Sequence, residues 1–374
     1  MDVLGERALN RALLARQGLL EPLAGGVGEV VGAVGALQMQ YWPALGPALW
    51  SRMAGVEPDA GFRAHADGAV LTGTLLRGTI HTVAAGQYGA YAAVAAASRV
   101  AQWRAGGDPG PGVGELLAVL RERGTSARPV AELVEIVEKW VADHPGAVSE
   151  AEAAAQRQYK WFGLMIRAGF VRVPADGVWS PKTPAHFLLS PVVDRPVLDE
   201  ALKSVIRLHL AAFGPAAAED VAHWIGWNIT PVRAALRQMT ELLQFSDESG
   251  RTLYDHPDSP RPGPDTPAPV RLLPWFDSTL LAYAPGHRTR LLPEPYRDSV
   301  YVKVNGQIRP TFLVDGMVAG TWSLAATRRT ATLTLTPLQP IPPATRRKLT
   351  TEAERLTAFC HPEAGDHQVI LESQ

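Results

Sequence analysis

The pair Gln38 and Gln40, separated by one residue, presents two neutral carboxamide groups at a spacing that could bring them together. In an extended segment, residues i and i+2 point to the same side, so both amides would face one spot while Met39 turns inward. On a helix the two side chains would diverge by roughly 200°. Pro43 disfavours a helical conformation for Trp42 before it, which favours the extended arrangement.

A carboxamide is a poor proton acceptor, so this pair cannot act as an ordinary general base. It can hold and polarise a small molecule such as water, because each amide offers N–H donors and an oxygen acceptor. The competing interpretation is a polar helix end whose amides satisfy loose backbone groups. On the pair alone the polar helix end is favoured, and it is the rest of the chain that favours a functional pair.

Three further stretches accompany the pair, and their order and spacing carry a resemblance. They are LRGTIH at 76–81, LPWFD at 273–277, and IRPT at 308–311 followed by VDGMVAGTW at 314–322. With these stretches, the chain resembles the winged-helix DNA glycosylases of the AlkZ and YcaQ type from about residue 6 to residue 360. That family carries a glutamine-apolar-glutamine or glutamine-apolar-aspartate motif as its catalytic signature.

The resemblance implies a monofunctional DNA glycosylase with Gln38 and Gln40 as the catalytic residues. A guanine alkylated at N7 is already cationic, so its departure needs no protonating acid, and a water must only be placed at the anomeric carbon. Glutamine at the second position resembles the AlkZ branch, which implies bulky adducts or interstrand crosslinks left by a genotoxic natural product. In that branch the enzyme gives self-resistance during antibiotic biosynthesis, through base excision repair.

Several residues near the pair are candidates for contact with DNA or the lesion. Trp42 could stack on an extruded nucleotide, although core packing is the alternative use for Trp42, Tyr41 and the other nearby tryptophans. Arg77, Thr79 and His81 would share one face of an expected strand and face DNA. For His81 the alternative is a buried, hydrogen-bonded histidine beside a surface arginine.

Four more candidates lie in the C-terminal part of the chain. Asp277 is expected to cap a helix, or else to help shape the lesion pocket, as the resemblance implies. Lys303 and Arg309 are expected to contact phosphates, because they lie on or next to the strand that enters the Asp315-Gly316 turn. Asp315 in that turn is a further candidate.

The elements that must position these residues are mainly helices with small β elements. Short helices followed by a brief two-strand element occur three times, which is the outline of a winged helix-turn-helix. The predicted units are a first winged-helix unit at 1–85, a second at 86–190, a third at 191–255, a proline-rich linker at 256–269, and an antiparallel β domain closed by a helix at 270–374.

Within this outline some elements are predicted in detail. A single long helix is expected at 149–169, with Gln156 and Gln158 on its solvated surface. Strands at 170–173 and 178–180 are expected to form a hairpin around Asp176-Gly177. In the last domain, alternating apolar residues predict strands at 300–304, 308–314, 317–324 and 331–335, followed by a helix at 343–360.

Composition sets further bounds on the class of protein. The net charge of −1, from 36 basic and 37 acidic residues, is low for a DNA-binding protein unless charges of one sign gather on one face. One cysteine, Cys360, excludes an internal disulfide framework and suits the cytoplasm. We expect a cytoplasmic monomer that acts on double-stranded DNA without a metal or other cofactor and does not cross a membrane.

Two other classes of protein remain open at this point. A non-enzymatic winged-helix regulator would need a strongly basic recognition helix, and the candidate helix at 229–242 carries only Arg233 and Arg237. A small-molecule hydrolase or drug-sequestering protein would be the third class, and no nucleophile motif supports a hydrolase.

Overall fold

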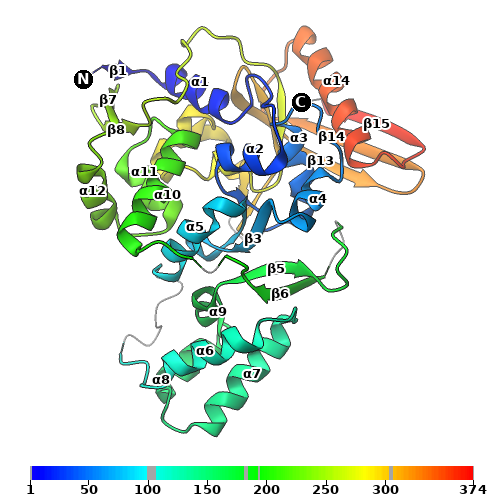
Figure 1. Ribbon diagram of the computed structural model, residues 1–374. Helices are drawn as coiled ribbons and strands as arrows, with labels where there is room; N and C mark the ends of the chain where they lie inside the picture. The colour runs from blue at the N-terminus through cyan, green and yellow to red at the C-terminus, as the bar shows by residue number, and fades with distance from the viewer. Residues whose placement is uncertain (1, 99–106, 181–183, 193, 303–305, 374) are drawn as a thin grey trace.

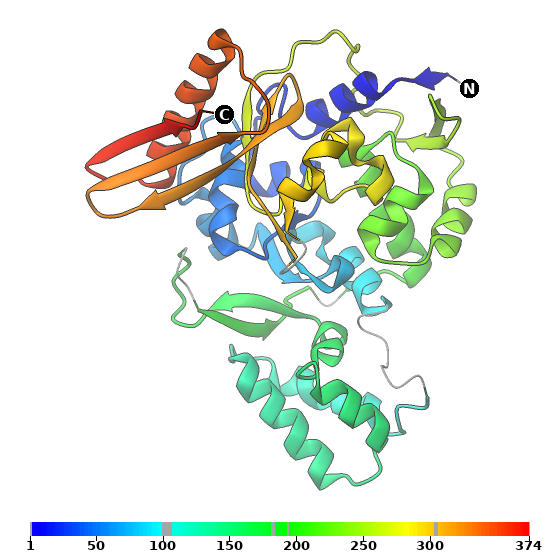
Figure 2. The ribbon, with the colours of Figure 1, turned by 180° about the vertical axis from the view of Figure 1, so that it is seen from behind.

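Helices and small sheets make up the computed structural model, which describes residues 2–98, 107–180, 184–192, 194–302 and 306–373. A large body holds both termini, and a smaller lobe of helices hangs from one side of it (Figures 1 and 2). The expectation of a mainly α fold with small β elements is confirmed.

The N-terminal part of the body carries the glutamine pair. Its elements are β1 (Val3–Leu4), α1 (Glu6–Arg16), α2 (Val27–Val34), β2 (Leu37–Gln38), η1 (Trp42–Ala44), α3 (Leu45–Trp50), α4 (Ala60–Ala66), β3 (Val70–Thr74), η2 (Leu76–Gly78), β4 (Ile80–Ala84) and η3 (Ala85–Gln87). Apolar side chains of α2, α3 and the strands form one buried cluster that includes Val31, Met39 and Leu49. Met39 therefore turns into the core, as the extended arrangement predicts.

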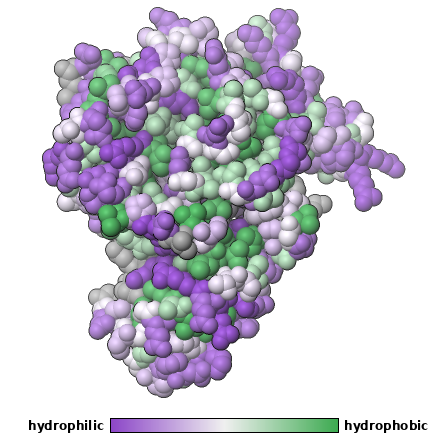
Figure 3. Space-filling view, in the orientation of Figure 1, coloured by the Kyte–Doolittle hydropathy of each residue, from purple (hydrophilic) through white to green (hydrophobic). Residues whose placement is uncertain are grey.

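The lobe follows α5 (Tyr88–Ala96) in the chain. Its elements are α6 (Val113–Arg123), α7 (Val130–Asp143), α8 (Glu150–Arg157), α9 (Phe162–Ala168), β5 (Phe170–Pro174) and β6 (Ala185–Leu189). It has an apolar core of its own, built around Leu120, Leu133 and Trp161. In the space-filling view, apolar side chains gather where the lobe meets the body (Figure 3).

A single five-stranded sheet joins the lobe to the body, in the order β2-β4-β3-β5-β6. The joining pair is Gly73 of β3 with Val171 of β5, and the strands run antiparallel. The two hairpins predicted for separate units are therefore parts of one sheet. Glycine at position 73 suits this close approach, because a Cβ there would lie 3.2 Å from the carbonyl oxygen of Phe170.

The single long helix predicted at 149–169 is wrong. It is broken into α8 and α9 by Lys160 and Trp161, whose φ angles of 49° and 58° are left-handed. The indole of Trp161 is buried and donates a hydrogen bond to Glu138 of α7 at 2.6 Å. This tertiary contact outweighs the local preference for helix, and Gln156, expected at the surface, is buried and donates to Glu152 at 2.6 Å.

The hairpin predicted around Asp176-Gly177 also differs from the structure. Residues 178–180 form no strand, and the partner of β5 is β6, which begins at Ala185. Trp179 packs instead against Trp42 and His65, with ring centroids 5.7 and 4.5 Å apart. The first residues after the turn are therefore used for packing rather than for pairing.

Three helices and a hairpin follow the lobe and return to the body. They are α10 (Leu198–Phe213), α11 (Ala218–Ile225), α12 (Ile229–Gln238), β7 (Leu243–Asp247) and β8 (Thr252–Asp255), and the N-terminal strand β1 pairs with β7 in parallel. Helix α10 packs against α1, α2, α5 and α12, so it forms the centre of the largest apolar core.

The C-terminal part is a sheet and a helix, as predicted, but it is not wholly antiparallel or closed by the helix, because a last strand at Asp366–Leu371 pairs in parallel with the strand at Thr330–Pro337. Its elements are β9 (Arg271–Leu273), η4 (Ser278–Leu280), η5 (Pro285–Arg290), η6 (Glu294–Tyr296), α13 (Arg297–Val300), β10 (Tyr301–Val302), β11 (Gln307–Ile308), β12 (Thr311–Val314), β13 (Met317–Ala326), β14 (Thr330–Pro337), α14 (Pro343–Cys360) and β15 (Asp366–Leu371). Helix α14 has the predicted bounds. The strand predicted at 308–314 is interrupted at Pro310, which lacks an N–H for a sheet ladder, and part of the strand predicted at 300–304 lies outside the described residues.

The proline-rich segment 256–269 has no regular structure, but arginines of α1 hold it in place. Arg7, Arg11 and Arg16 donate hydrogen bonds to the carbonyl oxygens of Pro264, Thr266 and Pro260, respectively. Among the described residues, no helix is both long and apolar enough to span a membrane.

Candidate catalytic site

Gln38 lies on the short edge strand β2, where it pairs with His81 of β4. The backbone N–H of Met39 donates to the carbonyl oxygen of Ile80 at 2.8 Å, so the chain is still paired one residue later. The extended segment ends at Tyr41, whose φ and ψ are −118° and 103°. The prediction that Trp42 lies outside a helix is wrong, because Trp42 begins the 3₁₀ turn η1 and Pro43 occupies its second position, where a missing N–H costs nothing.

The carboxamide oxygen of Gln38 is held by neighbouring donors. Arg77 donates to it through Nη2 at 2.7 Å, and the hydroxyl of Thr79 lies 3.4 Å away. That hydroxyl has one proton and is closer to the carbonyl oxygen of Leu76, at 3.1 Å. One lone pair of the Gln38 oxygen therefore stays available, and its Nε2 has no hydrogen-bond partner in the described part of the chain.

Gln40 is exposed to solvent and anchored in a different way. Its carboxamide oxygen accepts the backbone N–H of Ile80 at 2.8 Å, so its side chain continues the strand pairing where the backbone bends away. Both amide oxygens of the pair are thus fixed by the single segment 77–80. Each oxygen keeps a lone pair, and neither Nε2 has a hydrogen-bond partner among the described residues, so both amides have unused hydrogen-bonding groups.

Arg77 connects this site to α11. It lies in η2 with a left-handed φ of 54°, and its Nη1 donates to the carbonyl oxygen of Trp224. The turn packs closely on Gly226, where a Cβ would come within 3.0 Å of the Cα of Arg77. Burial lowers the pKa of Arg77 to about 10, so the guanidinium is still charged at neutral pH.

His81 is buried beside Arg77. Its Nδ1 lies 2.9 Å from the carbonyl oxygen of Thr79, which requires a proton on Nδ1, and its Nε2 lies 3.5 Å from Arg77 Nη2. Burial, and then the charge of Arg77, lowers the pKa of His81 to about 3. The histidine is therefore neutral at physiological pH, with Nε2 facing the guanidinium as an acceptor.

The predicted face of Arg77, Thr79 and His81 is confirmed only in part. Strand β4 begins at Ile80, so Arg77 and Thr79 are not on a strand. Their side chains nevertheless converge, but on Gln38 rather than on solvent. For His81, the alternative of a buried, hydrogen-bonded residue describes the structure, and the arginine beside it is largely buried too.

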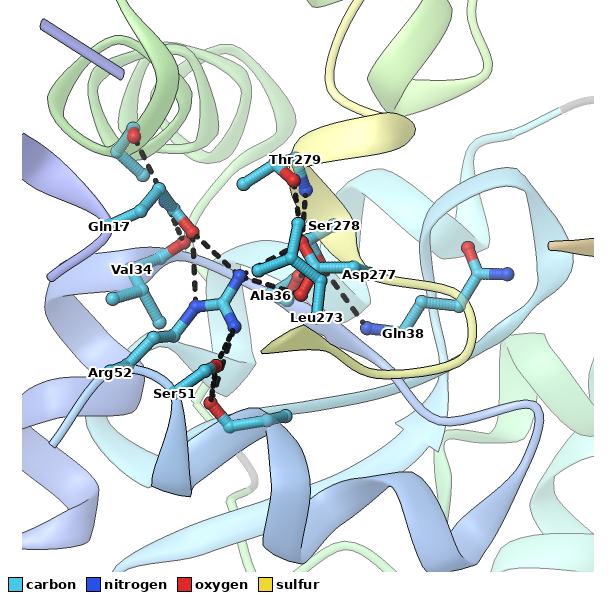
Figure 4. A network of polar contacts seen from close by, with 12 residues as sticks. Gln17, Val34, Ala36, Gln38, Ser51, Arg52, Leu273, Asp277, Ser278 and Thr279 are labelled. Atoms are coloured by element: carbon cyan, nitrogen blue, oxygen red, sulfur yellow. Dashed lines mark hydrogen bonds and ion pairs between the residues drawn. The ribbon is translucent and has the colours of Figure 1, made fainter. Parts of the chain in front are cut away.

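A buried network behind the pair fixes the backbone of Gln38 (Figure 4). The hydroxyl of Ser278 accepts the N–H of Gln38 at 3.3 Å and donates to the carbonyl oxygen of Ala36 at 2.8 Å. Ser278 follows Asp277, whose carboxylate receives Arg52 Nη2 at 2.9 Å on each oxygen. In the figure, the amide of Gln38 points away from this network.

Asp277 thus acts as the predicted cap. Its Oδ1 accepts the N–H of Thr279 at 3.0 Å and the hydroxyl of Thr279 at 2.6 Å, at the start of η4. Its carboxylate is buried and paired with Arg52, so it contacts Gln38 only through Ser278. Sequence reasoning missed Arg52 and Ser278, because nothing in their local sequence signals a contact with residues more than 200 positions away.

The other predicted DNA- or lesion-binding residues lie apart from this network. Trp42 is buried, donates to the carbonyl oxygen of Ser180 at 2.9 Å, and lies under the guanidinium of Arg172. Asp315 pairs with Arg7 and Arg11 of α1. Arg309 is exposed, and its side chain makes no ion pair with the described residues, whereas Lys303 lies outside them.

Tyr41 differs from the expectation that it belongs to the core. Its side chain is 41% exposed, and its ring centroid lies 5.0 Å from that of Trp275. An exposed aromatic ring next to Gln40 is suitably placed to contact a base.

The side chains around the glutamine pair can bind a small polar molecule. Two fixed neutral amides and a buried guanidinium offer hydrogen bonds and a positive charge, and Asp277, the carboxylate that lies behind the pair, is neutralised by Arg52. Among the described residues no group of three or more histidine, cysteine, aspartate or glutamate residues could hold a metal ion.

Comparison with known proteins places this chain in a family. The model of the DNA glycosylase AlkZ-like family matches residues 31–359. The interstrand DNA cross-link repair glycosylase of Streptomyces sahachiroi is 27% identical over 315 residues, which cover 79% of this chain and 81% of that protein. The solved structure of Streptomyces sahachiroi DNA glycosylase AlkZ has a TM-score of 0.78 at 21% identity, and the match covers 99% of this chain and 100% of that one.

These findings define the class first: the protein is a DNA glycosylase, a hydrolase that acts on N-glycosyl bonds. The chain belongs to the AlkZ-like DNA glycosylase family, because the family model covers most of its length. The resemblance carried by the glutamine motif is confirmed, and the regulator and the small-molecule hydrolase are set aside.

Proposed function

We propose that this enzyme removes cationic N7-alkylguanines from DNA, using Gln38 and Gln40 to place the attacking water. The observation that carries the proposal is that the two side chains, whose amide oxygens are held in place, are both uncharged. An uncharged base would need an acid to protonate it or a carboxylate to stabilise the electron-poor sugar, and an N7-alkylated guanine needs neither in full.

The proposed reaction uses the free lone pairs of the two amides. The water donates hydrogen bonds to the oxygens of Gln38 and Gln40 while its own oxygen attacks C1′ of the sugar. The glycosidic bond breaks and its electron pair passes to the purine, which leaves as neutral 7-alkylguanine. The water becomes the C1′ hydroxyl of the abasic site and releases one proton to solvent.

Bulky adducts or interstrand crosslinks are the proposed lesions. The name of the Streptomyces sahachiroi relative supports this choice, and so does the exposure of Gln40, which leaves this amide accessible from solvent. Such lesions would come from a genotoxic natural product, and the enzyme would give its producer self-resistance through base excision repair.

The proposal includes how the molecule binds DNA. The three sets of helices with a following hairpin would serve as winged helices that hold duplex DNA, with the domain limits at 85, 190, 255 and 269. Arg309, Lys303 and Tyr41 would contact the DNA, and the enzyme would act as a monomer without a metal or other cofactor.

The test is a matched set of duplexes that carry N7-methylguanine, a bulkier N7-guanine adduct, or uracil, scored for abasic sites. The parent enzyme should release both guanines and leave uracil. Gln38→Ala and Gln40→Ala should each slow excision by roughly 10²-fold or more, because each removes a preorganised polar group, with DNA binding unchanged. Gln40→Asp should keep substantial activity, because a carboxylate can hold the same water.

Two results would refute the proposal. Efficient uracil release would show that the site can expel a neutral base. Full activity of the doubly substituted Ala enzyme would remove the glutamines from the mechanism.

A further inference from the structure

A cavity of about 280 Å³ lies between the lobe and the sheet that carries the glutamine pair, and Gln40 forms part of its wall. Ile80 of β4, the residue whose N–H anchors Gln40, lines it too. From the lobe, α7 and α9 contribute Leu133 and Met165, and β6 contributes Phe187. The cavity is therefore continuous with the site at Gln40.

Large apolar side chains surround the mouth of this cavity. Val130, Tyr159 and Phe162 line it, and they are 38%, 51% and 36% exposed, respectively. Single exposed apolar residues are common on proteins, but three around one cavity mark a binding surface. Lys160 is the charged residue at the rim, where it is exposed to solvent.

The rim is held rigidly by the break between α8 and α9. Trp161 is buried and donates to Glu138, and Arg157 binds the same carboxylate through Nε and Nη2 at 2.9 to 3.0 Å. Lys160 and Trp161 have strained left-handed conformations, which other contacts must stabilise. Because the walls of the cavity are already ordered, a group can bind there without the entropy cost of ordering them.

The shape and chemistry of the cavity identify its occupant. A cavity of roughly 150 Å³ can hold a benzene ring, so 280 Å³ accommodates a group of about two rings. An extruded guanine does not suit it, because its hydrogen-bonding edge would meet mostly apolar walls and stay unsatisfied. An apolar substituent on the guanine fits the same walls and stays attached to the lesion at Gln40.

We propose that this cavity binds the apolar, one- or two-ring substituent of an alkylated guanine and makes the enzyme prefer such lesions over N7-methylguanine. Lys160 at the rim would pair with a phosphate of the strand that carries the lesion. The inference rests on the proposed function, because it assumes a lesion positioned at Gln38 and Gln40. It adds a reason for substrate choice that the glutamine pair alone does not provide.

The test compares duplexes that carry N7-benzylguanine, N7-methylguanine or the small polar N7-(2-hydroxyethyl)guanine. Val130→Trp should fill the mouth of the cavity, and Phe162→Ala should remove part of its apolar rim. Val197→Trp is the matched control, because Val197 is 73% exposed and is not among the residues that line the cavity.

The parent should have a higher kcat/KM for the benzyl lesion than for the other two. Val130→Trp should reduce the benzyl-to-methyl ratio by about tenfold or more, the scale of discrimination in apolar pockets, mainly through slower excision of the benzyl lesion. Phe162→Ala should reduce the ratio in the same direction, and Val197→Trp should not. Equal loss on both lesions, or an unchanged ratio in Val130→Trp, would overturn the inference.

A binding measurement separates this inference from the proposed function. A fluorine at the sugar 2′ position disfavours the electron-poor transition state, so lesions with this sugar can be titrated without excision, using fluorescence anisotropy. If the parent excises none of the guanines, the proposed function fails. The cavity would still be supported by tighter binding of the benzyl duplex that Val130→Trp abolishes, and it would be refuted if that preference is missing.

Discussion

Side chains from two distant parts of the chain hold Gln38. Ser278 accepts its backbone N–H, and Arg77 donates to its amide oxygen. The guanidinium orients the amide, because a donor at 2.7 Å requires the oxygen of Gln38, and not its NH₂, on that side. The outward group is then Nε2 together with the free lone pair of the oxygen. Arg77 thus orients and polarises the amide of Gln38, which makes it a positioning residue in the proposed mechanism.

Replacing Arg77 by Met should slow excision about tenfold, because the amide of Gln38 would rotate freely between two orientations. Thr79→Val is the matched control and should change the rate less, since the hydroxyl of Thr79 is 3.4 Å from the same oxygen. Single-turnover rates and duplex affinities should be measured together. A rate unaffected by Arg77→Met, at equal DNA affinity, would remove the positioning role.

At the scale of elements, the ion pair between Arg52 and Asp277 joins the end of α3 to η4 and so holds Ser278 against β2. Both side chains are almost completely buried. Removing one partner of such a pair leaves the other as an uncompensated charge, which is far more costly than removing both.

Asp277→Ala should therefore reduce the free energy of unfolding by about 3–5 kcal/mol and weaken excision as well. The double variant Arg52→Met with Asp277→Leu should regain much of the stability, because no buried charge is left, but not the cap on Thr279. Urea denaturation measures the first effect and single-turnover excision the second. A double variant less stable than Asp277→Ala would contradict this account.

Elements that depend on local sequence patterns were predictable from the sequence, and elements that depend on contacts between distant residues were not. Helix α14 and the Asp315-Gly316 turn follow from apolar periodicity and turn chemistry, and both are as predicted. The break at Trp161 and the pairing of Gly73 with Val171 depend on contacts that no local pattern encodes. The same holds for the site, where the glutamines are visible in the sequence but Arg52, Ser278 and the cavity at Phe162 are not.

At the scale of the whole molecule, the near-neutral charge must be reconciled with an enzyme that acts on DNA. Some basic residues are not available to phosphates. Arg290 is buried, donates to the carbonyl oxygen of Pro215 at 2.9 Å and lies over the ring of Tyr283. Exposed cations such as Arg309 are better candidates for electrostatic contact with DNA.

Arg309→Ala should weaken binding to duplex DNA and flatten the dependence of log K on log salt by about one unit, because one phosphate contact releases about one counterion. The measurement is a salt titration of affinity for an undamaged duplex. Arg290→Met is a useful comparison, since a buried arginine should leave the slope unchanged. An unaltered slope in Arg309→Ala would place Arg309 outside the interface.

Helix α1 and strand β2 depend on contacts with residues far along the chain, which determines when they can fold during synthesis. Arg16 forms a buried ion pair with Asp255, Arg11 pairs with Asp315, and the N–H of Gln38 is held by Ser278. A ribosome delivers these partners more than 200 residues after the groups they hold. Strand β2, which carries Gln38, can therefore reach its final position only late in translation. Until then the apolar faces of α1 and β2 stay uncovered, and chaperones can bind them.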